Sequence, residues 1–195
     1  MVPSRIKTFL PILILFLMII TTFSGKPVLA EEKAGEMTPI PMISGIEMLK
    51  VGDAAPDFSV RDLDQGEFNM KGALAGNKGV LIFFWSIFCE PCKAELPIIQ
   101  ELTEEYGERG IGVVGVAIDG APMQEAIKAF IAQENYTFRV LIDELNPDES
   151  FVIADPYGVA GTPTLYFVSG QGVVQFAKVG RASKEEIEAV IKQAL

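Results

Sequence analysis

Histidine is absent from the 195-residue chain, and cysteine is limited to Cys89 and Cys92. Without imidazole, the chain alone supplies no Ser-His-Asp or Cys-His catalytic group and no histidine ligand for zinc or haem. Two thiolates are fewer than the four ligands of a structural zinc site, so a metal clip would need a second chain. We expect no metal and no cofactor within one chain.

Basic residues are also scarce, with 16 Lys and Arg against 26 Asp and Glu. Three of the basic residues, Arg5, Lys7 and Lys26, lie in the first thirty positions, which hold no acid. The rest of the chain therefore carries 13 basic and 26 acidic residues, a net charge of −13. Such a surface repels phosphate backbones, so no nucleic-acid partner is expected.

The apolar stretch near the N-terminus is short for a membrane span. Even extended to Phe23, the run that starts at Phe9 has 15 residues, against the roughly 20 that cross a bilayer comfortably. With Arg5 and Lys7 before it and Ala30 after it, the pattern predicts that residues 1–30 are an export signal peptide or an uncleaved membrane anchor. Residues 31–47 are interpreted as a flexible tether and 48–195 as the folded domain, placed outside the cytosol.

Apolar patterning along the domain predicts alternating strands and helices. Continuous apolar runs at 80–85 and 111–118 are typical of strands covered on both faces. Recurrence every three or four residues predicts helices at 96–106 and from 122 to 131, and a capping box at Ser183 begins a C-terminal helix. Shorter strands are predicted at 58–63, 67–70, 138–142, 165–168 and 173–179. The order indicates an α/β sandwich with a mixed central sheet.

The two cysteines lie in Cys89-Glu90-Pro91-Cys92, directly after the strand that ends at Trp85 and at the start of the first long helix. A thiol at a helix N-terminus faces free N–H groups that favour the thiolate. Cys89 is then the exposed attacking thiol and Cys92 the resolving thiol one turn inside. A structural disulfide or a metal clip between chains are the alternatives, but a bridge across four residues removes little chain entropy.

The stretch Phe84-Trp85-Ser86-Ile87-Phe88-Cys89-Glu90-Pro91-Cys92-Lys93, with Gly161-Thr162-Pro163-Thr164 downstream, resembles the thioredoxin fold. Extended through Glu95 to Pro97, it is similar to the exported thiol–disulfide oxidoreductases of the TlpA/ResA type. The resemblance implies a three-layer α/β sandwich with an N-terminal β-hairpin and a central helix–strand insertion. It also implies protein thiol or disulfide substrates, a membrane-embedded electron donor, action in cytochrome c maturation or a related pathway, and no dissociable cofactor.

One acid stands out beside the cysteine pair. Ordinary thioredoxins carry a buried Asp six residues before the first cysteine, where this chain has Phe83. Glu95 lies three residues after Cys92, on the same face of a helix. Spacing alone favours a solvated carboxylate, whereas the resemblance implies a buried acid that accepts the proton of Cys92.

The resemblance also implies a substrate-docking surface. It places a cis peptide before Pro163, facing the cysteines, which leaves the Thr162 backbone free to pair with an extended substrate. Phe88 and Glu90 flank the attacking thiol and complete the predicted substrate-binding residues.

The favoured function is an exported enzyme that reduces protein disulfides. A disulfide-forming oxidase is the nearest alternative. A peroxiredoxin-like antioxidant is a weaker one, because Ser86 fits that family three residues before the cysteine while Ile82 replaces its Pro. A redox-inert peptide-binding module is the alternative outside enzymes.

Overall fold

The computed structural model describes residues 47–195. The predicted signal or anchor at 1–30, and residues 31–46 of the predicted tether, lie outside the described residues. Within residues 47–195, no helix has both the length and the apolar character needed to cross a bilayer.

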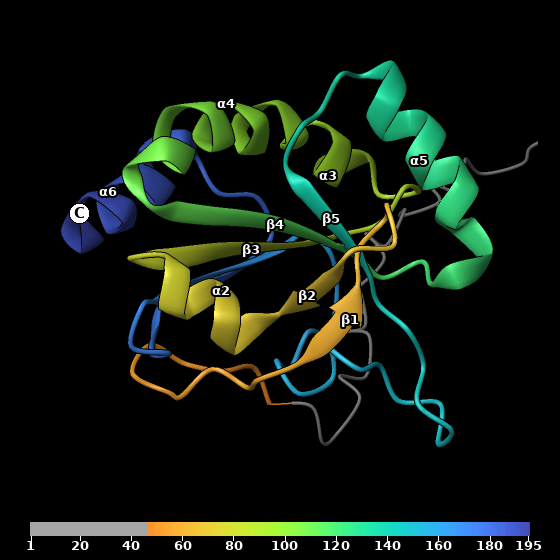
Figure 1. The fold of residues 1–195 in the computed structure, drawn as a ribbon, viewed down its shortest axis with the longest axis horizontal. Coiled ribbons are helices and arrows are strands. Elements are labelled where there is room, and N and C mark those ends of the chain that lie inside the picture. The colour runs from red at the N-terminus through yellow and green to blue at the C-terminus, as the bar shows by residue number, and fades with distance from the viewer. Residues whose placement is uncertain (1–46) are drawn as a thin grey trace, which may run out of the picture. The chain divides into compact units, whose positions relative to one another are not determined.

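A five-stranded mixed sheet forms the centre of the domain (Figure 1). The strands β3 (Gly79–Trp85), β4 (Ile111–Ala117) and β5 (Arg139–Ile142) run parallel to one another. Strand β6 (Thr164–Ser169) is antiparallel to β3, and β7 (Val174–Val179) is antiparallel to β6, which gives the order β5-β4-β3-β6-β7. Every residue of β3 is buried, as expected for a central strand covered on both faces.

Helices cover one face of the sheet, and a hairpin with a short helix covers the other (Figure 1). The first layer contains α4 (Leu96–Tyr106), α5 (Gln124–Gln133) and α6 (Lys184–Ala194). The opposite layer contains β1 (Ser59–Arg61), β2 (Glu67–Asn69) and α2 (Met70–Gly76), together with residues 151–159. Two 3₁₀ turns, η1 (Gly107–Arg109) and η2 (Ala121–Met123), flank β4. The predicted three-layer sandwich is thereby confirmed.

Strand β3 divides the core into two parts by simple alternation. Leu81, Phe83 and Trp85 pack among the side chains of α4, α5 and α6. Ile82 and Phe84 point the other way, into the cluster under the hairpin. Because successive strand side chains face opposite sides, one apolar run contributes to both layers. Each such buried side chain contributes about 1.5–3 kcal/mol of hydrophobic stabilisation.

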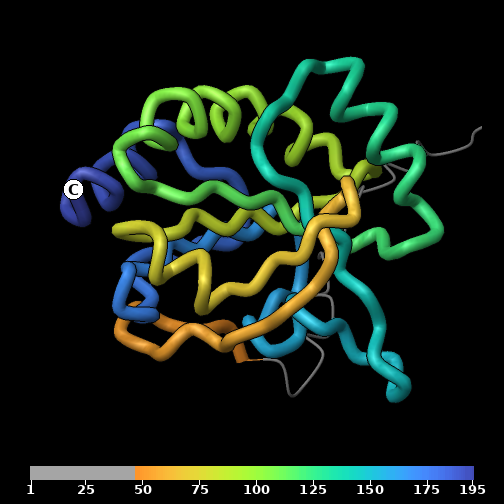
Figure 2. Tube along the Cα trace, viewed as in Figure 1, coloured from red at the N-terminus to blue at the C-terminus, as the bar shows by residue number. Residues whose placement is uncertain are grey.

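The start of the described chain is attached to the turn between β6 and β7, and Figure 2 shows the two segments side by side. The Gly52 N–H donates to the Val174 carbonyl at 2.9 Å, and the Ala55 N–H donates to the Gly172 carbonyl at 2.8 Å. Met48 packs against the core on the same side. The hydrogen-bonded fold therefore includes residues close to 48, the predicted start of the domain.

Two local predictions were wrong. Met70 was expected to end a strand, but β2 ends at Asn69, whose side chain accepts a hydrogen bond from the Gly72 N–H at 2.8 Å and caps α2. The single long helix after the cysteines is instead α3 (Glu90–Lys93) followed by α4. Pro97 has no N–H for the Lys93 carbonyl, and its ring crowds that position, which explains the interruption.

Candidate active site

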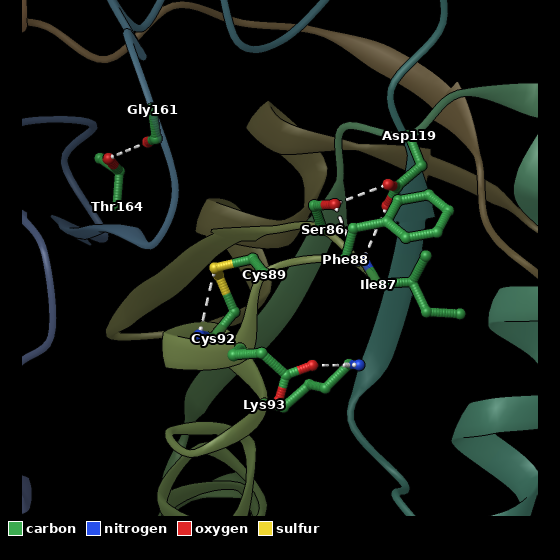
Figure 3. The surroundings of a disulfide bond; sticks show 10 residues. Ser86, Ile87, Phe88, Cys89, Cys92, Lys93, Asp119, Gly161 and Thr164 are labelled. Carbon is green, nitrogen blue, oxygen red and sulfur yellow. Dashed lines mark hydrogen bonds and ion pairs between the residues drawn. A yellow bond between two sulfur atoms is a disulfide. The ribbon is translucent and has the colours of Figure 1, made fainter. Parts of the chain in front are cut away.

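The cysteine pair lies at the sheet edge where the parallel strands β3 and β4 both end. After Trp85, three residues lead to Cys89, which occupies the N-cap of α3. Cys89 and Cys92 form a disulfide, with their Cα atoms 5.2 Å apart (Figure 3). The Cys92 N–H also donates to the Cys89 sulfur at 3.2 Å. A backbone N–H at the start of α3 therefore faces this sulfur, as expected from the sequence.

The two sulfurs differ in their access to solvent. Cys92 is fully buried in the core beneath α4, whereas Cys89 is partly exposed. An incoming disulfide can therefore reach Cys89 but not Cys92. The predicted roles of attacking and resolving thiol require this asymmetry.

Glu95 is fully buried, at the junction between α3 and α4. Its Oε1 accepts a hydrogen bond from the Ala182 N–H at 2.8 Å, while Oε2 has no partner among the described residues. Burial raises the pKa of this carboxyl, against the opposing effects of the Ala182 N–H and the charges of Arg181 and Lys178. The solvated position favoured by spacing alone is therefore wrong. Phe83, where thioredoxins have their acid, is a buried core residue.

The loop before β6 lies at the same edge of the sheet. Thr164 pairs with Phe84 near the end of β3, so the residues just before Thr164 are adjacent to the end of that strand. The Thr162–Pro163 peptide is cis, and the Thr164 hydroxyl donates to the Gly161 carbonyl at 2.7 Å. Gly161 and Thr164 are among the residues surrounding the disulfide in Figure 3. Pro163 is buried and Thr162 is half-buried.

Two predicted substrate-binding side chains are on the surface. Phe88, directly before Cys89, is 72% exposed, the highest exposed fraction among the exposed large apolar residues of the described chain. Glu90 is exposed and pairs with Lys93 at 2.9 Å. Such a surface pair contributes at most about 1 kcal/mol. Trp85, in contrast, is fully buried and packs against Phe130, with ring centroids 6.0 Å apart.

An acid that sequence reasoning missed lies beside the loop that precedes Cys89. Asp119 follows the end of β4, and its Oδ1 accepts from the Ser86 hydroxyl at 2.7 Å. Its Oδ2 accepts from the Ile87 N–H at 3.0 Å, and the Ser86 oxygen accepts from the Phe88 N–H at 3.1 Å. The available signal was topological, since a residue just after β4 lies beside residues just after β3 in a parallel sheet.

A second buried acid follows β5. Asp143 is fully buried and accepts from the Ile153 N–H at 2.9 Å and the Ala154 N–H at 2.8 Å. Burial raises the pKa of this carboxyl to about 6. Its contacts hold the loop after β5 against the sheet. Among residues 47–195, no cluster of three or more Cys, Asp or Glu side chains is arranged to hold a metal ion.

Comparison with known proteins relates this fold and site to one family. The model of the AhpC/TSA family matches residues 51–177. The thiol-disulfide oxidoreductase ResA of Oceanobacillus iheyensis is 33% identical over 149 residues, which cover 74% of this chain and 73% of that protein. The thioredoxin-like protein YneN of Bacillus subtilis is 34% identical over 143 residues, covering 72% of this chain and 78% of the relative.

A solved structure agrees with these sequence matches. A Chlorobium tepidum protein assigned as the thiol:disulfide interchange protein DsbE superposes with a TM-score of 0.63 at 30% identity. The superposition covers 75% of this chain and 98% of the other. With its Cys89–Cys92 pair and thioredoxin-like sheet, the chain belongs to the AhpC/TSA family and, within it, to the ResA-related thiol–disulfide oxidoreductases.

Proposed function

We propose that this protein reduces protein disulfides outside the cytosol, with the Cys89–Cys92 dithiol as the electron source. The observation that carries the proposal is the pairing of a partly exposed Cys89 with a fully buried Cys92, whose backbone carbonyl accepts from the N–H of the buried Glu95 at 2.9 Å. This arrangement supports a two-step exchange in which only one sulfur meets the substrate. ResA, the named relative, is a thiol-disulfide oxidoreductase.

The exchange begins from the reduced dithiol. The Cys89 thiolate attacks one sulfur of the substrate disulfide, the substrate S–S bond breaks, and the departing thiolate takes up a proton. The Cys92 thiolate then attacks the Cys89 sulfur of the mixed disulfide and releases the second substrate thiol. Two electrons pass from the dithiol to the substrate, and the protein is left in the disulfide form that the structure contains.

Glu95 is proposed to accept the proton of Cys92 before the second step. Cys92 is fully buried, so water has little access to its thiol. Burial raises the pKa of Glu95, which brings its proton affinity closer to that of a thiol and makes the transfer less unfavourable. Among residues 47–195, no group donates a hydrogen bond to the Oε2 atom of Glu95, so this oxygen is available to accept a proton.

Substrate docking is proposed at the same edge of the sheet. The exposed Phe88 ring offers an apolar contact beside Cys89, and the Thr162 backbone offers hydrogen bonds to an extended chain. Exposed Glu90 directly follows the attacking sulfur in the chain and pairs with Lys93, so this side of the proposed docking surface carries an ion pair.

The proposed setting follows from the first thirty residues. An export signal or anchor at 1–30 places the domain outside the cytosol, in a periplasmic or other extracytoplasmic space. A membrane-embedded electron donor then restores the dithiol after each turnover. Cytochrome c maturation, implied by the TlpA/ResA resemblance, is the proposed pathway.

The peroxidase alternative finds little support in the geometry, although the matching family model carries the AhpC/TSA description. Ser86 occupies the position of the peroxiredoxin Thr or Ser, but its one hydroxyl proton is donated to Asp119. It therefore has no proton for the sulfur of Cys89. Ile82, a buried residue of β3, occupies the position of the peroxiredoxin Pro.

The reduction potential of the Cys89–Cys92 couple tests the direction of electron flow. Thioredoxin is near −270 mV and the oxidase DsbA near −120 mV, a difference of about 7 kcal/mol for two electrons. We expect a value closer to that of thioredoxin, together with reduction of insulin disulfides. A potential near that of DsbA would identify an oxidase, and consumption of hydrogen peroxide would identify a peroxidase. A protein with no redox activity in these assays would be a binding module.

A further inference from the structure

The N–H groups of Ile87, Phe88 and Cys89 are all engaged by two residues, Ser86 and Asp119. The Ile87 N–H donates to Asp119, and the Phe88 N–H donates to the Ser86 hydroxyl oxygen. The Cys89 N–H donates to the Ser86 carbonyl at 3.1 Å. Three consecutive donors before the attacking sulfur are thus paired, and this pairing gives the segment one hydrogen-bonded conformation.

Asp119 is the group on which this arrangement depends. Its carboxylate accepts from the Ser86 hydroxyl and from the Ile87 N–H, and hydrogen bonds to an ionised acceptor are about twice as strong as neutral ones. Because the Ser86 hydroxyl donates its hydrogen bond to Asp119, a lone pair of the Ser86 oxygen is oriented toward the Phe88 N–H (Figure 3). The Ile118 N–H donates to the Trp85 carbonyl at 3.0 Å, which keeps the ends of β3 and β4 together.

The conformation held in this way has two consequences for the reactive edge. It leaves the Phe88 ring 72% exposed, and it delivers Cys89 to the N-cap of α3, where the Cys92 N–H reaches its sulfur. An unpaired Ser86–Phe88 segment would have other conformations open to it. In those conformations the ring and the sulfur would no longer keep their present relative positions.

We propose that Asp119, acting through Ser86 and Ile87, is a positioning residue that presents Cys89 and Phe88 to a protein disulfide in one fixed arrangement. The proposal rests on the proposed function, because it assumes that Cys89 is the attacking sulfur. Ser86 and Asp119 act as one unit in this account. Losing Asp119 frees the Ile87 N–H and the Ser86 hydroxyl, and losing Ser86 frees the Phe88 N–H, so either loss removes contacts that hold this segment.

The test measures the first attack alone, in a full-length Cys92→Ser background that cannot resolve the mixed disulfide. Single-turnover trapping of a disulfide-containing protein gives the rate of attack by Cys89. Asp119→Ala and Ser86→Ala are each expected to slow trapping about tenfold, equivalent to about 1.4 kcal/mol. The double variant is expected to be slowed by the same factor, since residues of one network are not additive.

Conservative variants separate positioning from a general loss of structure. Ser86→Thr keeps the hydroxyl, and Asp119→Asn keeps an oxygen for the Ile87 N–H and an amide that can donate to Ser86. Both are expected to trap within about threefold of the parent rate, because a kept contact keeps most of its hydrogen-bond energy. Asp53→Ala is the matched control. It also removes one negative charge, but Asp53 lies beside Val174, at the opposite edge of the sheet.

The outcomes are distinguishable. Trapping by Asp119→Ala and Ser86→Ala at the parent rate would overturn the positioning role and leave the proposed function standing. A roughly hundredfold loss in the double variant would also overturn it, because the two residues would then act independently. If Asp119→Ala does not fold, Ser86→Ala decides the question. If the parent Cys92→Ser protein traps no mixed disulfide, the proposed function fails and the inference fails with it.

Discussion

Replacing Glu95 with Gln removes the proposed proton acceptor while keeping the shape of the side chain. The Gln carbonyl oxygen can still accept from the Ala182 N–H, which Glu95 Oε1 meets at 2.8 Å. We therefore expect the free energy of unfolding to change by less than about 1 kcal/mol. Glu95→Ala is the contrasting variant, because it leaves the buried Ala182 N–H without a partner and costs about 1–3 kcal/mol.

The kinetic effect of Glu95→Gln is expected in the second step only. Attack by Cys89 on the substrate does not involve Glu95, so its rate stays at the wild-type value. Resolution by Cys92 loses its base and slows by about 10²–10⁴-fold, the usual contribution of general acid–base catalysis. This loss corresponds to about 3–5 kcal/mol in the activation free energy. Mixed disulfide then accumulates during turnover.

The pH dependence has a definite sign. Burial raises the pKa of Glu95 above its ordinary value of 4.5, and only the ionised carboxylate accepts a proton. The wild-type resolution rate therefore falls as pH drops through this raised pKa, whereas the Glu95→Gln rate shows no such step. Single-turnover reduction of a disulfide substrate is followed at reaction pH values from about 5 to about 9, and each time point is quenched with acid. This measures both rates. Superimposable resolution rates for the two proteins would refute the role of Glu95.

Three further predictions concern other parts of the molecule. In the native dithiol, iodoacetamide is expected to modify Cys89 alone, because Cys92 is fully buried; earlier modification of Cys92, seen by mass spectrometry, would reverse the assigned roles. Phe88→Ala is expected to slow reduction of a protein disulfide about tenfold while leaving a small aromatic disulfide unaffected, and equal slowing of both would deny Phe88 a docking role. In the folded protein the pKa of Asp143 is about 6, above its ordinary value of 3.8. The folded state therefore binds this proton more tightly than the unfolded state does. As a result, the contribution of Asp143 to the free energy of unfolding falls as pH rises from about 4 to about 6. Lowering pH from about 7 to about 5 should therefore add about 1 kcal/mol to the free energy of urea unfolding through this group, and Asp143→Asn should lack that gain.

The central strands were predicted well because their signal is local. The apolar runs at 80–85 and 111–118 correspond to β3 (Gly79–Trp85) and β4 (Ile111–Ala117), each within one residue at either end. The capping box that begins α6 was also predictable, since Ser183 and Glu186 are three residues apart and bond reciprocally. Local patterns of this kind record which backbone conformation a segment prefers and which face it buries.

Helix α2 and the break before α4 were missed although local signals existed. The glycines in Met70–Gly76 weaken its helical pattern, and its cap on Asn69 looks like the end of a strand. Pro97 was the available sign of the break. The glycines of α2 and Pro97 therefore account for these two wrong predictions.

The site was predictable where the motif is contiguous and unpredictable where it is assembled by folding. Cys89 and Cys92 are three residues apart and form the disulfide. The Ala182 N–H reaches Glu95 from 87 residues away, and Ser86 reaches Asp119 across 33 residues. The buried carboxyl of Glu95 therefore meets the segment that leads into α6, which is distant in sequence. Spacing along one helix cannot supply that information.

Trapping of a protein substrate tests most directly whether Cys89 is the sulfur that attacks. The Cys92→Ser and Cys89→Ser proteins, each reduced and mixed with a disulfide-containing protein, are compared by mass spectrometry of the covalent adducts. The partly exposed position of Cys89 and the buried position of Cys92 predict a stable adduct through Cys89 in the first protein and none in the second. An adduct through Cys92, or no adduct in either protein, would contradict the proposed exchange.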